Sequence, residues 1–468
     1  MNEKAKKFHI NPYILVILSF LVIILLGSVL LCMPWARTDH AWGWTNFIDQ
    51  LFAATSATCV TGLSAYSNGI AGELTIGGQI VMLCMIQIGG LGFITVLTFL
   101  LTLFKAKLQF KDRYVLSQAV NSTSLADVVK FVRKVCAVTG IVELIGIILG
   151  LPVWYFICDK NIGQTIWNSI FTSISAFNNA GFDVLGATSL IRTGALAAIP
   201  YGAYIYLLVY IMILIILGGL SFLVILEVFS FKKKPSQWRA FTKITLTMVS
   251  LLLVFGFVVF MISEVWLGHN GFTPLDAIFQ SVTCRTAGFA SFEQENMTLL
   301  GKVGSCFLMF IGGSPLSTAG GIKITTVYMI ALAMWSYFRG RPVSSFKRVY
   351  STNMVIKAMS LLLIALTVVL IGVLCINAFE NGNTYIIDGV EMPYRTEDIF
   401  FEVCSAFGTT GLTTTISVDL SIGSKIVMCI LMFLGRLGPM TFFQIFQTNI
   451  TKEYKGHYQY VEEDFLIG

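Results

Sequence analysis

Four short segments of the sequence share a pattern that could bind a cation through backbone oxygens. Each segment ends in a glycine followed by Leu or Phe, and the segments are residues 56–63, 175–182, 282–289 and 405–412. Glycine tolerates positive φ and has no side chain, so it allows successive carbonyl oxygens to turn toward a common axis. A ring of such carbonyls can replace the hydration shell of a monovalent ion. The pattern therefore indicates ion coordination by the backbone.

A single glycine at the end of an apolar stretch is better explained as a helix C-cap. Here four glycines agree in register, because an Asp or Asn stands three residues before a Phe upstream of each one. The interval from that Phe to the glycine is 10, 10, 9 and 10 residues, so the third copy is one residue shorter. This agreement favours an ion site over four independent caps.

The predicted ion ligands are backbone carbonyls of the two residues before each glycine. With the glycines, the predicted site comprises Val60, Thr61, Gly62, Asn179, Ala180, Gly181, Thr286, Ala287, Gly288, Thr409, Thr410 and Gly411. The upstream polar residues, which are suited to cap short helices at the positive end of the helix dipole, are Asp49, Asn168, Asp276 and Asp398. The opposite, partially negative end of each helix would then point at the site.

Charged and amide side chains beside the site need separate roles. Arg285 would repel cations if it faced them, so it is expected to turn behind the glycine and pair with a carboxylate such as Glu402 or Asp49. The amides of Asn178 and Asn179 are expected to brace the second segment rather than bind ions.

The composition requires a membrane environment for the 468-residue chain. Hydrophobic residues make up 56% and charged residues only 12%, with a mean hydropathy of +0.79. Ordinary globular domains carry about 25% charged residues, so a water-facing surface cannot be built here. The apolar runs are continuous rather than alternating, which indicates an all-α membrane protein. The net charge of +6 would suggest nucleic acid as a partner, but its distribution argues for membrane orientation and no nucleic acid.

Eight apolar segments are long enough to cross a hydrocarbon core of about 30 Å. They begin near residues 13, 75, 131, 201, 244, 305, 355 and 426. Between the members of each pair lies a shorter stretch that predicts a re-entrant helix buried in protein, at residues 45–58, 164–177, 273–284 and 395–407. Glu143 lies inside one span, and a packing contact, a dimer contact and a functional role are all open for it.

Lys and Arg are distributed unequally between the two sides of these spans. With the N-terminus inside, 22 of the 31 lie in inner segments and seven on the other side. This bias predicts that both termini are cytoplasmic. Sixteen of the 25 acidic residues then fall on the outer side or in the re-entrant stretches. We therefore expect a net negative outer vestibule that concentrates cations.

The chain reads as four repeats of one unit, each a span, a re-entrant pore helix and a second span. The first spans start at intervals of 118, 112 and 112 residues. The predicted units are residues 13–104, 131–230, 243–338 and 355–449, followed by a tail at 450–468. The predicted architecture has eight transmembrane helices around a pseudo-fourfold central pore.

Glycine-rich stretches interrupt the second spans, at residues 87–93, 217–222, 311–321 and 434–439. In three of them the small residues are expected to serve close packing between helices. The third contains too many helix breakers for a continuous helix, and irregular backbone at membrane depth is tolerated where it lines a water-filled cavity. Its residues include Gly312, Gly313, Ser314, Pro315, Ser317, Thr318, Gly320 and Gly321.

These four units resemble those of the Trk/Ktr/HKT superfamily of potassium transporters over nearly the whole chain. More narrowly, the chain resembles the membrane subunit of bacterial Ktr systems, because only twelve residues precede the first span, whereas Trk subunits carry an additional pair of spans there. In that family a glycine in all four filters goes with potassium selectivity, and all four are glycine here. The resemblance implies sodium-influenced uptake of K⁺ across a bacterial plasma membrane.

The resemblance also implies a gate and partners. The stretch at 312–321 is similar to the family's intramembrane gating loop below the filter, and Arg436 to its pore-facing arginine, so the two form the expected constriction. The sequence has no Walker A run and no dinucleotide-binding G-x-G-x-x-G motif, so no cofactor is expected in this chain. The family implies a homodimer and a separate cytoplasmic ring of nucleotide-binding regulatory subunits.

The alternative from another class is a sodium-coupled secondary transporter of another small solute. Such folds usually show inverted or parallel pairs of larger repeats, not four short ones. A membrane-embedded enzyme fits less well, because no span carries a paired His, Asp or Glu set suited to metal or acid–base work. No enzymatic activity is therefore expected.

Overall fold

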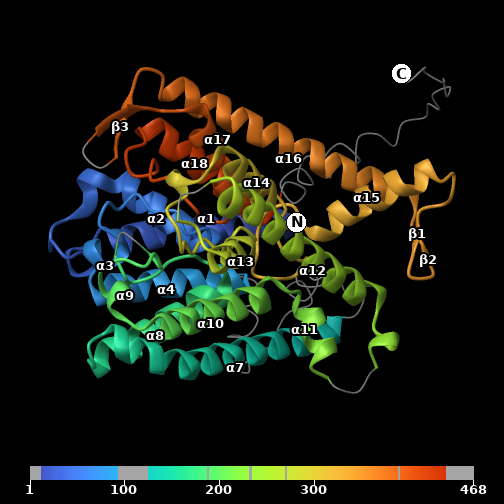
Figure 1. Cartoon of the computed structure of the whole chain (residues 1–468), viewed down its shortest axis with the longest axis horizontal. Helices are drawn as coiled ribbons and strands as arrows, with labels where there is room; N and C mark the ends of the chain where they lie inside the picture. The colour runs from blue at the N-terminus through green and yellow to red at the C-terminus, as the bar shows by residue number, and fades with distance from the viewer. Residues whose placement is uncertain are drawn as a thin grey trace, which may run out of the picture.

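The computed structural model describes residues 12–92, 125–186, 189–230, 234–268, 271–387 and 390–438, which are mostly helical (Figure 1). Several expectations from the sequence lie outside these residues. They concern the N-terminal arm, the inner loop at 105–124, the ends of the first and fourth predicted units at 93–104 and 439–449, and the tail at 450–468.

Four long helices lie where the first span of each unit is expected. They are α1 (Pro12–Leu31), α7 (Leu125–Ile157), α12 (Ala240–Phe260) with its π-helical extension η4 (Met261–Trp266), and α16 (Thr352–Phe379). Large apolar side chains along them are exposed, including Leu26 at 60%, Ile148 at 58%, Val254 at 62% and Leu374 at 69%. A contiguous apolar surface of this kind suits contact with lipid, not water.

Four shorter helices match the predicted re-entrant stretches. They are α2 (Phe47–Cys59), α8 (Ile162–Asn178), α13 (Pro274–Thr283) and α17 (Thr396–Gly408). The phenylalanine that sets the register in each, at positions 52, 171, 279 and 401, is fully buried. The parts of these helices that lead into the glycine segments are therefore buried in the protein, whereas α8 begins at the surface, with Ile162 67% exposed.

A further helix follows each short one, and all four end at the predicted glycine-rich stretches. They are α4 (Ile76–Leu91), α10 (Tyr201–Gly219), α14 (Leu299–Phe310) and α18 (Ile422–Leu437). α4 and α18 end at Gly92 and Gly438, each with φ of +80°. α10 stops before α11 (Phe222–Val228), and α14 is separated by residues 311–323 from α15 (Ile324–Phe338).

The glycine-rich stretches both pack closely and end their helices, whereas the sequence suggested only close packing for three of them. Gly89 and Gly435 do pack closely, since a Cβ atom there would collide with the backbone carbonyls of Thr58 and Phe407. Each helix also ends within a few residues of that contact. The expectation of packing alone is therefore incomplete, because other glycines of the same stretches, Gly92 and Gly438, supply the positive φ at which these helices end.

Small elements decorate the two ends of the helical body. They are η1 (Pro34–Ala36), η2 (Gly43–Asn46), α3 (Gly69–Glu73), α9 (Gly194–Ala198), η3 (Pro235–Gln237) and η5 (Gln294–Asn296). Two antiparallel hairpins pair β1 (Ser344–Ser345) with β2 (Arg348–Val349) and β3 (Thr384–Ile387) with β4 (Val390–Pro393). The two hairpins lie at opposite ends of the molecule (Figure 1).

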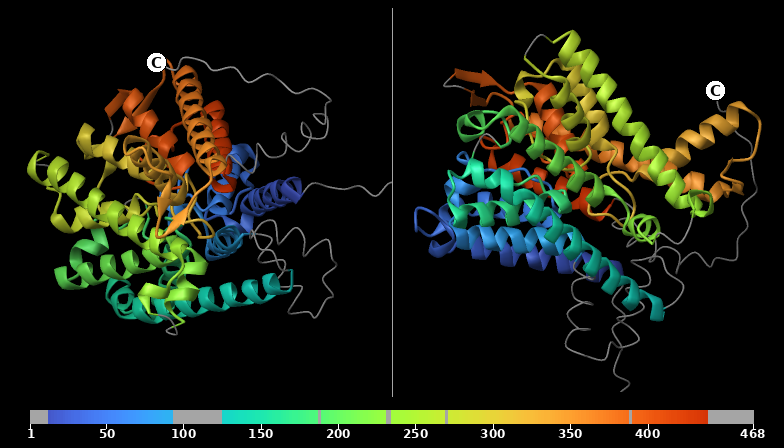
Figure 2. Two further views of the ribbon diagram at one scale, coloured as in Figure 1. Left: turned by 90° about the vertical axis from the view of Figure 1, so that its right-hand side faces the viewer. Right: turned by 60° about the horizontal axis from the view of Figure 1, so that its bottom comes forward.

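The helices are arranged in a closed circle. Each helix after a short one contacts the next short helix along the chain: α4 contacts α8, α10 contacts α13, and α14 contacts α17. The last of them, α18, contacts α2, which closes the circle. We call the helices of each predicted unit a group. Viewed from the β1–β2 end, the four groups of helices surround a common centre in chain order (Figure 2, left).

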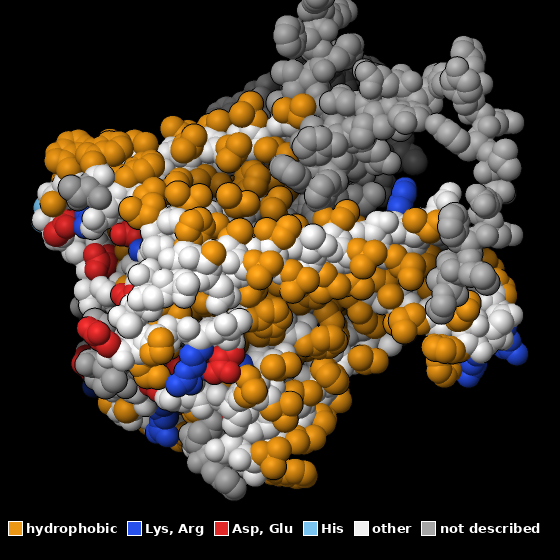
Figure 3. Space-filling model, turned by 90° about the horizontal axis from the view of Figure 1, so that it is seen from above, with side chains coloured by type: hydrophobic (Ala, Val, Ile, Leu, Met, Phe, Trp, Pro, Cys, Tyr) orange, Lys and Arg blue, Asp and Glu red, His pale blue; other side chains and the backbone are white. Residues whose placement is uncertain are grey.

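The outer surface supports a membrane location for this circle. Within the described ranges, four helices are long and apolar enough to cross a membrane, at Lys130–Ile157, Tyr201–Gly219, Ala240–Trp266 and Thr352–Phe379. Shorter apolar helices occur at Val16–Leu31, Ile76–Leu91, Leu299–Phe310 and Ile324–Phe338. Hydrophobic side chains cover the middle of the face in Figure 3, and charged side chains gather toward its ends. The chain is accordingly a multi-pass membrane protein.

Candidate functional site

Four glycine segments, residues 60–62, 179–181, 286–288 and 409–411, share one backbone conformation. The first residue of each is left-handed, with φ of 57° at Val60, 59° at Asn179, 68° at Thr286 and 50° at Thr409. The glycine two residues later also has positive φ, at 102°, 72°, 77° and 90° in chain order. Alternation of this kind turns the intervening carbonyls to one side, and non-glycine residues adopt it only at a cost.

The glycine segments meet one another in cyclic order. Each glycine approaches the carbonyl oxygen of the following segment so closely that no side chain fits between them. The four contacts are Gly62 with Ala180, Gly181 with Ala287, Gly288 with Thr410 and Gly411 with Thr61. In the first two, an added Cβ atom would lie 2.6 Å from the oxygen, and the other two are closer still. The structure thus brings all twelve predicted site residues together.

A hydroxyl side chain from each short helix braces the segment that follows it. Ser56 and Ser405 accept hydrogen bonds from the backbone N–H groups of Gly62 at 3.1 Å and Gly411 at 3.0 Å. In the other two units the hydroxyl donates instead, from Ser175 to the carbonyl of Phe182 and from Thr283 to that of Phe289. These bonds hold the extended backbone without using the carbonyls that face the centre.

The third segment is shorter for a visible reason. The helix before it, α13, ends at Thr283, and the backbone N–H of Ala287 donates to the Thr283 carbonyl at 3.0 Å. In the second segment the equivalent bond runs from Ala180 to Ser175, one residue farther along the chain, at 2.8 Å. The one-residue deletion predicted from the sequence is therefore absorbed at the helix end, and the glycine keeps its place.

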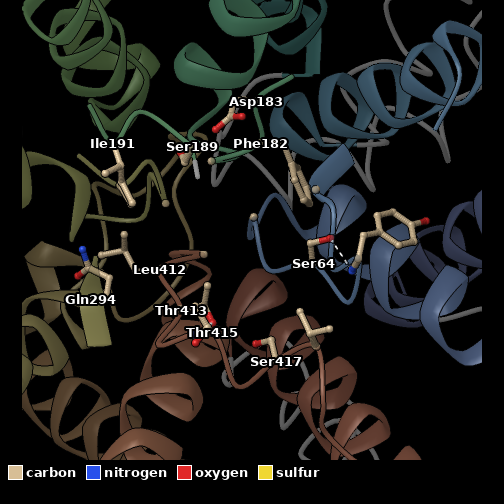
Figure 4. Close-up of a pocket in the computed structure, with 18 of the residues that line it drawn as sticks. Ser64, Phe182, Asp183, Ser189, Ile191, Gln294, Leu412, Thr413, Thr415 and Ser417 are labelled. Atoms are coloured by element: carbon tan, nitrogen blue, oxygen red, sulfur yellow. Dashed lines mark hydrogen bonds between the residues drawn. The ribbon is translucent and has the colours of Figure 1, made fainter. Parts of the chain in front are cut away.

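A pocket of about 460 Å³ opens on one side of the four glycines. Its walls come from all four groups of helices, as Figure 4 shows with Ser64, Asp183, Gln294 and Thr413 around it. Four acidic residues line it, at positions 183, 293, 295 and 419, and the described lining contains no Lys or Arg. Such a pocket raises the local concentration of cations.

One of the pocket acids is mostly buried. Asp183 is 8% exposed and accepts a hydrogen bond from the backbone N–H of Leu185 at 3.0 Å. Burial raises the pKa of the Asp183 carboxyl, and this hydrogen bond opposes the shift. Its charge is therefore lost at a higher pH than that of an exposed aspartate.

Several hydroxyls next to the ring are buried without a partner in the described part of the chain. They belong to Thr58, Thr61, Thr409 and Thr410. Buried polar groups in proteins are nearly always hydrogen-bonded, to protein or to water. A ring of carbonyls with such hydroxyls around it provides a polar path in an otherwise apolar interior.

On the side away from the pocket, the 312–321 loop lies against the other groups of helices. Thr318 donates from its hydroxyl to the carbonyls of Gly218 at 2.9 Å and Phe177 at 3.3 Å. The N–H of Gly321 donates to Gly435 at 3.2 Å. Phe177 lies four residues before the glycine of its own segment. The loop therefore lies beside the residues that lead into the second glycine segment.

Arg436 joins this loop to the first group of helices. Its guanidinium donates to the carbonyl of Thr318 in the loop and to those of Gly89 and Gly90 at the end of α4, the last at 3.2 Å. Lys323 just after the loop donates to the Ala319 carbonyl at 2.7 Å. The predicted gate residues, from Gly312 to Gly321 with Arg436, are thus in contact with one another.

Capping by the upstream polar residue is right for only one of the short helices. Thr273 and Asp276 form a capping box at the start of α13. Asn168 lies well inside α8, whose cap is Asn161. The sequence pattern located the short helices: the polar residue is the third helical residue in α2, α13 and α17, and only α8 begins four residues earlier relative to it.

The other two acids form ion pairs instead of caps. Asp49 binds Lys425 at 2.7 Å, and Asp398 binds Lys302 at 2.8 Å. These pairs join α18 to α2 and α14 to α17, and the sequence analysis missed them. One repeated position could have drawn attention to these lysines. Lys302 and Lys425, like Gln79 and Tyr204, stand four residues after the N-cap of their helix.

The expected partners of Arg285 are wrong. Asp49 is occupied by Lys425, and Glu402 accepts hydrogen bonds from Thr413, Thr414 and Ser417. Arg285 does turn behind its glycine segment, where its guanidinium donates to the carbonyl of Val249 at 3.5 Å.

Asn178, just before the second glycine segment, and Asn179, its first residue, both make contacts that brace it. The Asn178 amide donates to Gln87 at 2.9 Å and to Glu143 at 3.1 Å. The Asn179 amide lies 3.4 Å from the Thr286 hydroxyl of the next segment.

A ring of carbonyls below an acidic pocket, in a multi-pass membrane protein, suits the passage of a cation. The chain matches the TrkH family model, described as a cation transport protein, over residues 11–452, and it belongs to that family. The potassium/sodium uptake protein NtpJ of Enterococcus hirae is 33% identical, over 100% of this chain and 99% of that protein. The Ktr system potassium uptake protein B of Bacillus subtilis is 32% identical over 94% of each chain.

A solved structure of the same fold agrees. The potassium transporter TrkH from Vibrio parahaemolyticus superposes with a TM-score of 0.65 at 18% identity, covering 95% of this chain and 86% of that one. At this identity the likeness concerns the fold.

Proposed function

We propose that this chain takes up K⁺ across a bacterial plasma membrane through a selectivity filter formed by the four glycine segments. The observation that carries the proposal is the cyclic contact of these segments, in which each glycine meets the next carbonyl and the fourth meets the first. Backbone carbonyls can replace the water ligands of a desolvated monovalent cation. The names of the relatives, a potassium/sodium uptake protein and a potassium uptake protein, support K⁺ as the ion and an influence of sodium.

The proposed architecture is four repeats, at 13–104, 131–230, 243–338 and 355–449, with eight transmembrane helices around one pore. The closed circle of helix contacts supports it. Both termini are proposed to be cytoplasmic, because Lys and Arg concentrate in the segments that share their side. The acidic pocket then opens to the outside and the 312–321 loop lies below the filter, where K⁺ meets it after leaving the carbonyl ring.

The proposed gate is the 312–321 loop held by Arg436. A partly buried guanidinium in the ion path opposes a cation electrostatically in a low-dielectric surrounding. Its bonds to Thr318 and to the end of α4 hold the loop across that path. Transport then requires the loop to move, and the energy for that movement comes from outside this chain.

We further propose a homodimer with one pore per chain, and control by a separate cytoplasmic ring of nucleotide-binding regulatory subunits. The excess of Lys and Arg on the inner side supports an acidic docking surface on that partner. No cofactor is proposed for this chain, and nucleotide would bind only to the partner.

Cation flux in proteoliposomes tests the proposal. Purified protein is reconstituted and uptake is followed under K⁺, Rb⁺ and Na⁺ gradients, each with and without a second cation, against empty vesicles. We expect K⁺ and Rb⁺ uptake well above Na⁺ uptake, with Gly62→Ser and Gly288→Ser losing this preference because each added side chain disturbs the ring. Absence of K⁺ flux, with uptake of another solute driven by Na⁺, would instead establish the secondary transporter.

A further inference from the structure

Glu143 occupies an unusual place for an acidic residue. It lies in the middle of α7 and is 8% exposed. Among the described residues, Glu264 and Glu380 are also buried on first spans, but both lie at the ends of their helices. A carboxyl group at membrane depth is costly, so the partners that satisfy it indicate what it does.

The partners of Glu143 are two amides from other helices. Gln87 on α4 donates from Nε2 to Glu143 Oε2 at 3.2 Å. Asn178, the last residue of α8, donates from Nδ2 to Glu143 Oε1 at 3.1 Å and to Gln87 Oε1 at 2.9 Å. The three side chains form a closed triangle that ties α4, α7 and α8 together.

The triangle requires a group that only accepts hydrogen bonds at one corner. The two hydrogens of Asn178 Nδ2 face three acceptors, because the Ile174 carbonyl also lies 2.9 Å away, so one hydrogen is shared. Turning this amide over would set its oxygen against those acceptors. Turning Gln87 over would set its nitrogen against that of Asn178. Both amides therefore present donors to position 143, which a carboxylate satisfies and a glutamine does not. If residue 143 becomes Gln and residue 87 becomes Glu, the triangle again contains two amides and one carboxylate. Every donor in it can then still face an acceptor.

The triangle lies between the two parts of the ion path. Asn178 directly precedes the second glycine segment at 179–181. Gln87 lies two residues before Gly89, whose carbonyl accepts a hydrogen bond from Arg436. A side chain that fixes both amides thus fixes the end of α8, where the filter begins, relative to the end of α4, where Arg436 is held.

We propose that Glu143 is a positioning residue that holds the second filter segment in place against the Arg436 contact, and that K⁺ preference depends on it. The proposal rests on the proposed function as a K⁺ uptake protein. The contacts of Glu143 argue against a role in a dimer interface, because its carboxylate is directed at α4 and α8, not at the surface. The effect expected is on ion preference, since the glycine segment it braces supplies ring carbonyls.

The test compares Glu143→Gln, Gln87→Glu and the exchange variant that carries both. Each full-length protein is reconstituted, and the ratio of K⁺ to Na⁺ permeability, the K⁺ flux per folded molecule and the melting temperature are measured. We expect each single variant to lower the permeability ratio at least tenfold, and the exchange variant to lie within about threefold of wild type. Glu264→Gln is the matched control, because Glu264 is buried on another first span and accepts from the Thr298 hydroxyl. It should change stability without changing the ratio.

The outcomes separate this inference from the proposed function. Wild-type protein without K⁺ flux removes the proposed function before any variant is compared. If wild type transports K⁺ and Glu143→Gln keeps its permeability ratio, the positioning role is refuted. If Glu143→Gln does not fold, the exchange variant decides. An exchange variant that fails to fold, or folds with an altered ratio, refutes the role too, because the equivalence of the two positions is its premise.

Discussion

Replacing Gly181 by alanine should abolish most of the preference for K⁺ over Na⁺, whereas the same change at Gly186 should not. Both glycines line the same pocket and both have positive φ, 72° at Gly181 and 106° at Gly186. They differ in their surroundings. A Cβ atom on Gly181 would lie 2.6 Å from the Ala287 carbonyl oxygen, whereas no atom of the described residues lies within 4 Å of one on Gly186.

The magnitude follows from that difference. An L-residue in the left-handed region costs about 1–2 kcal/mol, and the wider φ of Gly186 is no easier for one, so both variants lose stability from the backbone alone. At Gly181 the contact must also lengthen toward the usual ~3.5 Å between non-bonded atoms, which moves the Ala287 carbonyl by most of an ångström. Loss of one charge–carbonyl contact, about 1.5–3 kcal/mol, corresponds to a change of roughly 10- to 100-fold in the permeability ratio.

The assay is the reversal potential of each reconstituted variant under bi-ionic K⁺/Na⁺ conditions, with melting temperatures measured alongside. Gly181→Ala should shift the reversal potential strongly toward that of a non-selective path. Gly186→Ala should keep the wild-type reversal potential although its melting temperature falls as well. Equal permeability ratios in the two variants would refute the reasoning. Backbone strain, which both variants share, would then explain any loss of K⁺ preference, and the cyclic contact would not contribute to selectivity.

Three other results follow from the same geometry. Arg436→Ala removes the bonds that hold the 312–321 loop, so flux should rise and lose its dependence on the regulatory partner while the K⁺/Na⁺ ratio stays fixed; low, partner-dependent flux would place the gate elsewhere. Lys302→Met should destabilise the fold by about 3–5 kcal/mol and Lys425→Met by less, because the carboxylate that loses its partner is 5% exposed in Asp398 but 27% exposed in Asp49. A lower melting temperature for Lys425→Met than for Lys302→Met would contradict this. A dimer of one wild-type and one filter-dead chain should keep about half of the flux, since each chain supplies all four segments, and complete loss would indicate a shared pore.

The parts of the site that sequence could predict are those set by local backbone chemistry. Glycines that need positive φ, and helix breakers such as those in the 312–321 loop, leave a signal at their own positions. Four copies of that signal, at an interval of 10 residues from the upstream Phe in three units and 9 in the third, located the segments. The short helices followed, because each had to end where its glycine segment begins.

The contacts that sequence could not predict are those between groups far apart in the chain. Asp398 was suited by type to a helix N-terminus, but its lysine partner is 96 residues away, and the repeated position of Lys302 after its N-cap does not say which acid it meets. Arg285 was given a carboxylate partner because a buried charge usually has one, yet the fold supplies a backbone carbonyl at that place. The Glu143 triangle likewise depends on how three helices pack.

The distribution of polar contacts around the circle has a physical logic of its own. Neighbouring groups in the chain are linked covalently, and between the first two a neutral contact suffices, in which Trp167 donates to Gln79 at 2.6 Å. The fourth and first groups have no such link, and there the structure has the Lys425–Asp49 ion pair, whose partners are 376 residues apart. Bringing together ends so distant carries the largest loop-closure entropy in the chain. A partly buried ion pair adds little net stability, but it penalises every mismatched arrangement in which one charge is left alone. The Lys302–Asp398 pair stands at the covalently linked junction of the third and fourth groups as well, so both contacts of the fourth group with its neighbours are charged. At the closing junction, the pair specifies a neighbour that the chain itself does least to bring near.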